Sequence, residues 1–344
     1  MSTQQLLTVE HSKATLVVPD APDIPGLNLR GFRGEVDFPS MLAVIQGSKE
    51  ADGIEWTNSV EDIARNYRHM VNCDPYQDML FVEVEGEPVG YSRVWWHREL
   101  DGKLRYHHFA HLLPAWRGQG LRRAMLRHCE RRLREIAAGH PLDVPRLFEA
   151  WASDTESDWE ALLLSEGYEA VRYNFDMVRP NLDDIPDLPL PEGLEVRPAR
   201  PEHYETIWKA AEEAFRDHWG EPEWQDEWFE EWKESPTFMP ELWQVAWDGD
   251  QVAGMVQNFI NHEENKEYDR RRGYTENISV RRPWRRRGLA RALIARSFQV
   301  IKAQGMTEAA LGVDAENPNG ALRLYQSMGF REVKRHTTFR KPLD

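Results

Sequence analysis

The sequence predicts an α/β (α+β) fold with two similar domains in tandem, each a mixed, mostly antiparallel sheet flanked by helices. The chain has 344 residues, which is longer than one ordinary domain. A segment rich in proline and aspartate, 181–192, indicates a stiff linker between residues 17–180 and 193–344. Both halves repeat one order of apolar patterns and turns. We therefore expect two copies of one domain.

The repeated order starts with alternating apolar and polar residues around a glycine turn, as in a β-hairpin. A strand-like run follows each hairpin, and an Arg/Gly-rich turn then leads into a helical pattern. The hairpins lie at 81–91 and 243–255, and the strand-like runs lie at 107–113 and 275–280.

The second half shows the remaining elements clearly. After the turn, apolar residues at helical spacing predict a helix that begins near Leu289 and ends before Gly305. A buried strand is expected at 309–314, a short helix at 319–329 and a final strand at 332–340. Strands alternating with helices predict a mixed sheet with helices on its faces.

Composition and charge exclude several classes of function. The chain has 58 acidic and 43 basic residues and a net charge of −15, which argues against binding nucleic acid or an anionic membrane. It has no apolar run long enough to cross a bilayer and no leader pattern, so we expect a cytoplasmic protein. Its two cysteines, Cys73 and Cys129, form no CxxC pair, and no His/Cys/carboxylate cluster has ligand spacing, so we expect no metal.

The strongest chemical signal is the turn between Val280 and Ala290. A strand that ends in a turn before a helix leaves the first N–H groups of that helix unpaired, and their partial positive charge attracts anions. Gly288 lets an anion approach the main chain, and the small Ala290 keeps the path open. The neighbouring guanidinium groups of Arg285, Arg286 and Arg287 add charged donors. A nucleotide pyrophosphate would fit such a turn.

The same arginines have a second interpretation as a solvated basic face or a nucleic-acid patch. Seven arginines lie between Arg281 and Arg296 with no acid among them. No aromatic platform interleaves with them, however, and the chain is acidic overall. We therefore favour the phosphate-binding turn.

Two motifs give this sequence its family resemblance. Arg285-x-x-Gly288-x-Ala290 resembles the Gln/Arg-x-x-Gly-x-Gly/Ala signature of the GNAT superfamily of acyl-CoA-dependent N-acetyltransferases, in the same strand, turn and helix context. The run from Ala321 to Phe330 resembles the second signature of that family, Ala-x-x-x-Tyr-x-x-x-Gly-Phe. The resemblance covers nearly all of residues 193–344 and, less sharply, 30–180.

The resemblance implies an enzyme that transfers acetyl from the co-substrate acetyl-CoA directly to a primary amine of a small molecule or peptide. Main-chain groups of the fourth strand would pair with the pantetheine arm, and the turn would hold the pyrophosphate. The residues implied for acyl-CoA binding are Ile278, Ser279, Val280, Arg285, Arg286, Arg287, Gly288, Leu289, Ala290 and Asn319.

Two proton transfers accompany the reaction that the resemblance implies. Tyr325 matches the phenol that protonates the departing thiolate in this family, and its alternative role is a core residue. Glu276 stands where many members carry a base or a bound water, but strict alternation places it on the buried face with Ile278 and Val280. It reaches substrate only if a β-bulge shifts the alternation, and its alternative role is a structural salt bridge. His262, Glu263 and Glu264 are weaker candidates for the base.

The first half keeps the turn but departs from the signature. When Gly120 is aligned with Gly288, Arg117 falls on Arg285, but Arg122 takes the place of the small residue. Leu163 takes the place of the acid. This layout is similar to that of tandem GNAT proteins of the mycothiol synthase type, in which one copy is catalytically worn. The degenerate first domain either binds a CoA through Gly118 and Gly120 or only completes the acceptor pocket.

Acceptor recognition in this family comes from helices before the hairpin, which here corresponds to 201–241. That segment is acidic and carries five tryptophans, which would suit a cationic amine, although a core role for the tryptophans is the simpler interpretation. His218 lies there and is expected to pack or to hydrogen-bond. The alternative to an enzyme is a non-catalytic acyl-CoA-binding sensor or scaffold, and the charge disfavours aminoacyl-tRNA as donor. Either a monomer or a homodimer fits.

Overall fold

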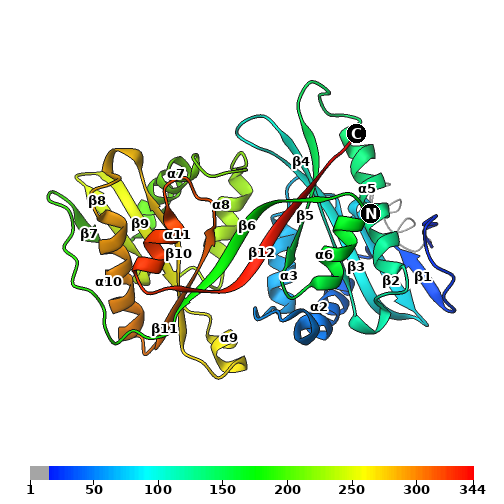
Figure 1. Cartoon of the computed structure of the whole chain (residues 1–344), viewed down its shortest axis with the longest axis horizontal. Helices are drawn as coiled ribbons and strands as arrows, with labels where there is room; N and C mark the ends of the chain where they lie inside the picture. The colour runs from blue at the N-terminus through cyan, green and yellow to red at the C-terminus, as the bar shows by residue number, and fades with distance from the viewer. Residues whose placement is uncertain (1–14) are drawn as a thin grey trace. The chain divides into compact units, whose positions relative to one another are not determined.

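The computed structural model describes residues 15–344, which form two compact units (Figure 1). Within the described chain, the first unit holds residues 15–171 and 337–344, and the second holds residues 172–336. These units differ from the expected ranges 17–180 and 193–344 at both ends of the second half. The difference arises because the chain leaves the first unit within one strand, β6, and returns to it within the last strand, β12.

The first unit is a mixed sheet with helices on both faces. Strands β1 to β4 pair antiparallel in chain order, and β5 pairs parallel to β4. Its strands are β1 (Leu27–Arg30), β2 (Met79–Val84), β3 (Glu87–Arg98), β4 (Leu104–Leu112) and β5 (Arg146–Ser153). Its helices are α2 (Phe38–Asp52), α3 (Val60–Arg68), α4 (Pro75–Asp78), α5 (Leu121–Ala137) and α6 (Ser157–Ser165).

The second unit repeats this order. Antiparallel pairing joins β7, β8, β9 and β10, while β11 pairs parallel to β10 and antiparallel to β6. Its strands are β6 (Glu169–Arg179), β7 (Glu195–Arg197), β8 (Gln244–Asp248), β9 (Gln251–Phe259), β10 (Arg272–Val280), β11 (Glu308–Asp314) and β12 (Arg331–Pro342). Its helices are α7 (Tyr204–Phe215), α8 (Asp226–Glu234), α9 (His262–Glu267), α10 (Leu289–Ala303) and α11 (Ala321–Ser327).

Short 3-10 helices mark several entries into these elements. They lie at Glu35–Asp37, Pro114–Trp116, Pro201–His203, Pro240–Leu242 and Arg282–Trp284. The second and the last of them immediately precede the two Arg/Gly-rich turns. The predicted hairpins, strands and helices of the repeat are all present, so the predicted fold class is confirmed.

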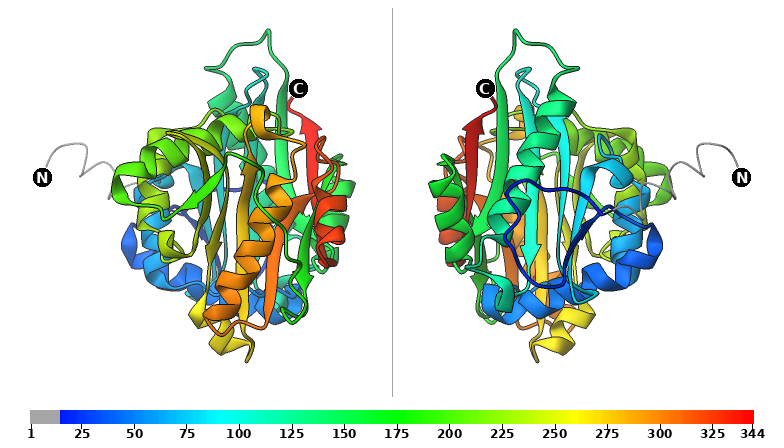
Figure 2. Two further views of the ribbon diagram at one scale, coloured as in Figure 1. Left: turned by 90° about the vertical axis from the view of Figure 1, so that its left-hand side faces the viewer. Right: turned by 90° about the vertical axis from the view of Figure 1, so that its right-hand side faces the viewer.

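Apolar residues of alternating strand positions bury two cores in the second unit. Helix α10 covers one face, where Leu293 and Phe298 pack against Val256 of β9. Helix α7 covers the other face, where Ile207 packs against Met255. Figure 2 shows α10, in orange, lying along the strands. The sheet is therefore covered by a helix on each face, and its strands end at the turns.

The final strand ends in the core of the first unit. Phe339 is buried in the cluster formed with α5, and the N–H of Leu343 donates to the carbonyl of Arg146 in β5 at 3.0 Å. Arg340 is buried and forms ion pairs with Glu149 at 2.7 Å and Glu99 at 2.6 Å. Breaking one partner of such a buried pair is costly, so these contacts fix the last residues in the first unit.

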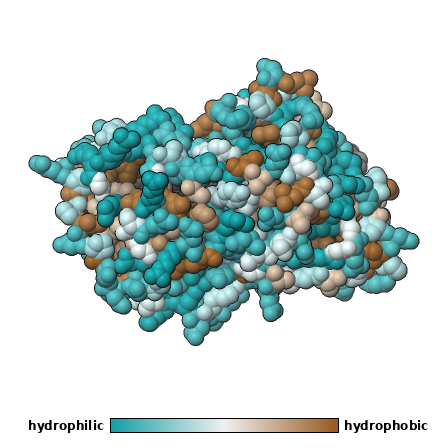
Figure 3. Space-filling model, viewed as in Figure 1, coloured by the Kyte–Doolittle hydropathy of each residue, from teal (hydrophilic) through white to brown (hydrophobic). Residues whose placement is uncertain are grey.

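The face of the molecule drawn in Figure 3 is mostly hydrophilic, with apolar residues in small groups. Within residues 15–344, no helix is both long enough and apolar enough to span a membrane.

Candidate active site

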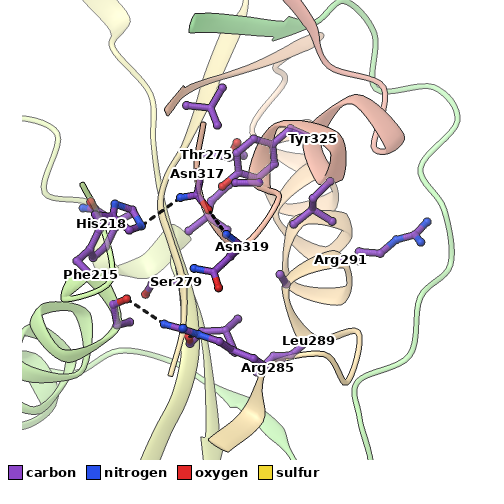
Figure 4. A pocket seen from close by; sticks show the side chains of 18 of the residues that line it. Phe215, His218, Thr275, Ser279, Arg285, Leu289, Arg291, Asn317, Asn319 and Tyr325 are labelled. Atoms are coloured by element: carbon purple, nitrogen blue, oxygen red, sulfur yellow. Dashed lines mark hydrogen bonds between the residues drawn. The ribbon is translucent and has the colours of Figure 1, made fainter. Parts of the chain in front are cut away.

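A cavity of about 470 Å³ lies in the second unit where β10 and β11 separate. Pairing between these strands covers only Arg272 to Tyr274 against Glu308 to Ala310, and beyond that they diverge. Figure 4 shows Phe215 and His218 on one side of the cavity and Leu289 and Tyr325 on the other, with Asn317 and Asn319 between them. The separation of two paired strands thus creates a space for a ligand within the sheet.

A β-bulge in β10 sets the side chains that face this cavity. Glu276 stands opposite Gln257, but Ser279 stands opposite Met255, so one extra residue is inserted between them. Asn277 in the bulge has φ of +48°, and its amide donates to the Gln257 Oε1 at 2.8 Å. Because of the extra residue, Glu276 and Ser279 face the same side of the sheet.

The residues between and after them turn the other way. Ile278 and Val280 pack against the core under α10, on the face opposite Glu276. Strict alternation had placed Glu276 on that buried face, and the bulge is the condition under which it was expected to reach substrate. All of Glu276, Ile278, Ser279 and Val280 line the cavity.

The turn before α10 has the backbone of an anion-binding site. Arg286 has φ of +60° and Gly288 has φ of +85°, and Gly288 is the N-cap of α10. Alternating signs of φ turn successive N–H groups toward one point, where the helix N-terminus adds positive potential. A Cβ at Gly288 would meet nothing within 4 Å, so the space above the turn is open. Arg286, Leu289 and Ala290 also line the cavity.

Arg285 plays a different part from the one expected of its side chain. Its Nε donates to the carbonyl of Val280 at 2.8 Å, its Nη2 to the carbonyl of Ala214 at 3.1 Å and its Nη1 to Asp217 at 2.5 Å. Ion pairs with Arg282 and Arg285 hold the pKa of the Asp217 carboxyl well below its usual range. The guanidinium of Arg285 is thus engaged within the unit and braces the turn against the end of α7.

The other arginines of the run also differ in their contacts. Arg281 pairs with Glu213 at 2.7 Å, and Arg287 donates to the carbonyl of Glu192 at 3.2 Å. Arg287 is not among the residues that line the cavity, whereas the exposed Arg286 is. The acidic partners of this run are Glu213 in α7 and Asp217 just after that helix. They are distant from the arginines in the sequence, so the sequence alone showed no acid beside the run.

The two predicted proton carriers both line the cavity. Tyr325 is 6% exposed on α11, and burial together with the negative charge of Glu276 raises the pKa of its phenol above the usual range. Burial, with a contribution from Asp176, raises the pKa of the Glu276 carboxyl to about 8, although the N–H of Gly312 donates to its Oε1 at 2.9 Å and opposes the shift. The phenol is therefore held as a donor, and the carboxylate becomes a base at mildly alkaline pH.

The weaker candidates for the base lie elsewhere. His262 and Glu263 are exposed on α9, outside the residues that line the cavity. Glu264 is buried and accepts hydrogen bonds from Tyr274 and Arg270. These contacts give Glu264 a structural role.

Asn317 and His218 complete the wall of the cavity. The ring of His218 lies 4.5 Å from that of Phe215, its Nε2 is 3.4 Å from the Asn317 amide, and burial lowers its pKa. The N–H of Asn319 donates to Asn317 Oδ1 at 2.9 Å, which orders the loop before α11. Sequence reasoning expected His218 to pack or to hydrogen-bond, and it missed Asn317. The Asn-Pro-Asn-Gly run after a strand was the signal that marked this loop.

Three of the five tryptophans of 201–241 pack on one another. The ring centroids of Trp208 lie 4.4 Å from Trp224 and 5.3 Å from Trp232. Phe215 and Phe238 lie at the edge of the same core. Most of this aromatic segment therefore stabilises the second unit, as the simpler interpretation held.

In the first unit, a side chain fills the position that is open in the second. The buried Arg122 donates through Nε to the carbonyl of Ala110 in β4 at 2.8 Å and lies 4.4 Å from the ring of Trp159. Leu163, which replaces the tyrosine, is buried in the core of that unit. Neither of these residues offers a proton to a thiolate.

The chain thus has two α/β units, and the second holds a cavity lined by a glycine turn at a helix N-terminus and by the side chains of Glu276 and Tyr325. A sequence profile described as the acetyltransferase (GNAT) family matches residues 45–144 and 204–330. The chain belongs to the GNAT family of acetyltransferases, with two copies of the domain in tandem.

Individual proteins show the same kinship. The chain is 26% identical over 294 residues to a mycothiol acetyltransferase of Geodermatophilus obscurus, covering 85% of this chain and 90% of the relative. A GCN5-related N-acetyltransferase of Sphaerobacter thermophilus has a TM-score of 0.69 and 28% identity, covering 94% of this chain and 96% of that one. A tandem GNAT protein from the clavulanic acid biosynthesis pathway has a TM-score of 0.62 at 12% identity, covering 92% and 99%, and shares the fold.

Proposed function

We propose that the second unit transfers acetyl from acetyl-CoA to the primary amine of a small molecule or peptide, and that the first unit is not catalytic. The arrangement of Glu276 and Tyr325 carries this proposal. Both line one cavity, and burial raises the pKa of each, so that the phenol keeps its proton and the carboxylate can accept one at mildly alkaline pH. We also propose that the protein is cytoplasmic, that it uses no metal and that it is a monomer or a homodimer.

The turn and the splayed strand account for acetyl-CoA binding. The N–H groups around Gly288 would receive the pyrophosphate, and the main chain of Ile278 to Val280 would pair with the pantetheine arm. The side chain of Arg285 contributes indirectly, because it joins the turn to Asp217 and to the carbonyl of Ala214. Arg286 and Arg291 both line the cavity with exposed side chains, and their guanidinium groups would remain for the phosphates.

The chemical step follows from the two ionisable groups. Glu276 takes a proton from the ammonium, and the free amine nitrogen attacks the thioester carbonyl carbon to form a C–N bond. The tetrahedral intermediate then breaks its C–S bond, and Tyr325 donates its proton to the departing thiolate. The nitrogen loses its second proton, which returns through solvent to the Tyr325 phenolate, and the proton on Glu276 passes to solvent, so the products are an amide, free CoA thiol and one released proton.

An amine screen tests the proposal. The purified full chain is mixed with acetyl-CoA and a library of primary amines, including amines related to mycothiol because of the name that its relatives bear, and free thiol is measured. We expect acetylation of at least one amine and its loss in Glu276→Gln. If acetyl-CoA binds but no amine is acetylated, the alternative of a non-catalytic acyl-CoA sensor or scaffold replaces this proposal.

A further inference from the structure

Two carboxylates flank a glycine on the open side of the cavity. Gly312 of β11 stands opposite Asp176 of β6, and paired residues on neighbouring strands point to the same face. The Glu276 carboxylate lies over the same glycine, because it accepts the Gly312 N–H at 2.9 Å and a Cβ there would come 3.9 Å from its Oε1. Glu276 and Asp176 therefore face one space that no side chain of residue 312 fills.

Neither carboxylate is neutralised by a lysine or arginine within the described chain. Glu276 forms no ion pair among residues 15–344, and its N–H partner is uncharged. Among the described side chains, Asp176 accepts only from the His336 Nε2, at 2.8 Å on Oδ2, and its own side chain is 51% exposed. Two carboxylates that share a space without such a cation create a strong local preference for a positive ligand.

A second feature of this cavity points independently to a polar ligand. Ser279 is 7% exposed, lines the cavity and faces the same side of β10 as Glu276. Its Oγ is buried and has no hydrogen-bond partner within the described residues. Leaving a buried hydroxyl unpaired costs free energy, so such a group at a cavity wall is suited to a ligand that satisfies it.

We propose that Asp176 and Glu276 together receive the ammonium of the acceptor, and that they exclude amines that carry a carboxylate on the adjacent carbon. This inference rests on the proposed acetyl transfer and narrows its substrate class. A carboxylate next to the reacting amine would approach both acidic side chains, and repulsion over a few ångströms in a partly buried site is strong. Amines with a neutral polar neighbour avoid the repulsion and can hydrogen-bond the Ser279 hydroxyl.

The role of Asp176 is one of positioning and selection. It lies one strand beyond the residues that line the cavity, and it acts on the acceptor through its charge. His336 occupies one of its two oxygens, Oδ2, and the Asp176 side chain is still half exposed. Its removal should therefore change which amines are used more than it changes the reaction itself.

The test compares two small acceptors of similar basicity, L-alaninol and L-alanine, which differ by a hydroxymethyl group in place of the carboxylate. We measure kcat/KM for each at saturating acetyl-CoA with the full chain. The wild type should prefer alaninol by at least about tenfold. In Asp176→Asn this preference should fall several-fold, through better use of alanine and a raised KM for alaninol, and the change should appear in KM more than in kcat.

The matched control is Asp187→Asn, which removes one exposed carboxylate from the segment 181–192. It should leave the preference unchanged. Equal use of both acceptors by the wild type, or a preference that Asp176→Asn does not alter, would overturn the inference while acetyl transfer stands. If larger amines react but alaninol does not, equal tolerance of a carboxylated and an uncarboxylated form of those amines overturns it too. Failure of every amine would instead remove the proposed function.

Discussion

The turns before α5 and α10 have the same backbone and the same brace, although they belong to different units. Gly118 and Gly120 have φ of +74° and +88°, close to the +60° and +85° of Arg286 and Gly288. Arg117 donates to the carbonyl of Leu112 at 3.1 Å and to the Asp52 carboxylate at 2.6 Å. In the second unit, Arg285 makes the equivalent contacts with Val280 and Asp217.

The strands that lead into these turns differ. In the first unit, β3 and β4 pair from Gly90 with Leu112 to Arg98 with Leu104 without a register shift. In the second unit, the bulge after Glu276 interrupts the pairing of β9 and β10. The position of Glu276 corresponds to His108, which is fully buried and bonded to Tyr168 at 2.6 Å. A continuous strand keeps this side chain in the core, whereas the bulge brings it to the cavity.

This comparison separates what holds the fold from what performs chemistry. The first arginine of the motif, its acidic partner and the positive φ angles persist in both units, so they belong to the architecture of the turn. The bulge in the strand before the turn, the small residue after the turn and the tyrosine at the position of Tyr325 occur in the second unit alone among the described parts of the chain. These differences support the proposal that acetyl-CoA binding and catalysis belong to the second unit.

The largest expected effect comes from the residue that the bulge exposes. Glu276→Gln should lower kcat by about 10²- to 10⁴-fold, because the ammonium loses its proton acceptor, while acetyl-CoA affinity changes little. Steady-state kinetics with an amine from the screen measure this. The control Glu263→Gln, an exposed carboxylate on α9, should behave as wild type. Normal turnover in Glu276→Gln would return Glu276 to a structural role.

The buried Arg122 of the first unit provides the next test. Arg122→Ala removes a hydrogen bond to the carbonyl of Ala110 and the contact with Trp159, so unfolding in urea should show a loss of about 2 kcal/mol. The first unit of this variant should still bind no acetyl-CoA, because β4 has no bulge. A second binding site in this variant would mean that Arg122 alone had closed the first unit.

Substitution of Tyr325, which stands where the first unit has Leu163, should have a smaller effect on kcat. Tyr325→Phe keeps the ring that packs 6.2 Å from Phe330 and removes only the hydroxyl. We expect kcat to fall about tenfold, since the thiol is a good enough leaving group to depart without full protonation. The dissociation constant of acetyl-CoA, measured by calorimetry, should stay the same. Unchanged kcat would leave Tyr325 as a core residue.

The protonation of Glu276 should also appear in pH profiles. With a pKa of about 8, its basic form increases as pH rises through that value, so kcat should rise between pH 7 and 9. Stability changes in the opposite direction. A raised carboxyl pKa means that the folded state binds more protons than the unfolded state. The contribution of Glu276 to the free energy of unfolding therefore falls as pH rises above its pKa in the unfolded chain, and at pH 9 the ionised carboxylate destabilises the folded protein. Urea unfolding should find Glu276→Gln more stable than wild type at pH 9, on the order of 1 kcal/mol, with little difference at pH 4.

The sequence predicted the parts of the site that depend on local spacing. The aligned glycines Gly120 and Gly288, the helix that follows each of them and the position of Tyr325 are all read from short motifs. The bulge at Asn277 is not, because it depends on which residues of β9 pair with β10. Asp176 was missed as a site residue, and the ion pairs of Asp217 with Arg282 and Arg285 were not foreseen, since each aspartate meets its partner across a large separation in the chain.

The expected domain ranges differ from the two compact units for the same reason, namely that long-range pairing is not visible in the sequence. A proline-rich segment marks where a chain lacks regular structure, and residues 181–192 contain no helix or strand. The boundary between the compact units depends instead on strand pairing, and β6 already pairs with β11 before that segment begins. The return of residues 337–344 to the first unit depends on Phe339 and Arg340 finding partners there, which no local pattern reveals.

The most direct measurement is a calorimetric titration of acetyl-CoA into the wild type and into two matched variants, Gly288→Glu and Gly120→Glu. Both glycines have nearly the same positive φ, so the two substitutions impose similar backbone strain and add the same charge. We predict one binding site in the wild type, retained in Gly120→Glu and lost in Gly288→Glu. Two sites in the wild type, or one site that survives Gly288→Glu, would contradict the assignment of acetyl-CoA to the second unit.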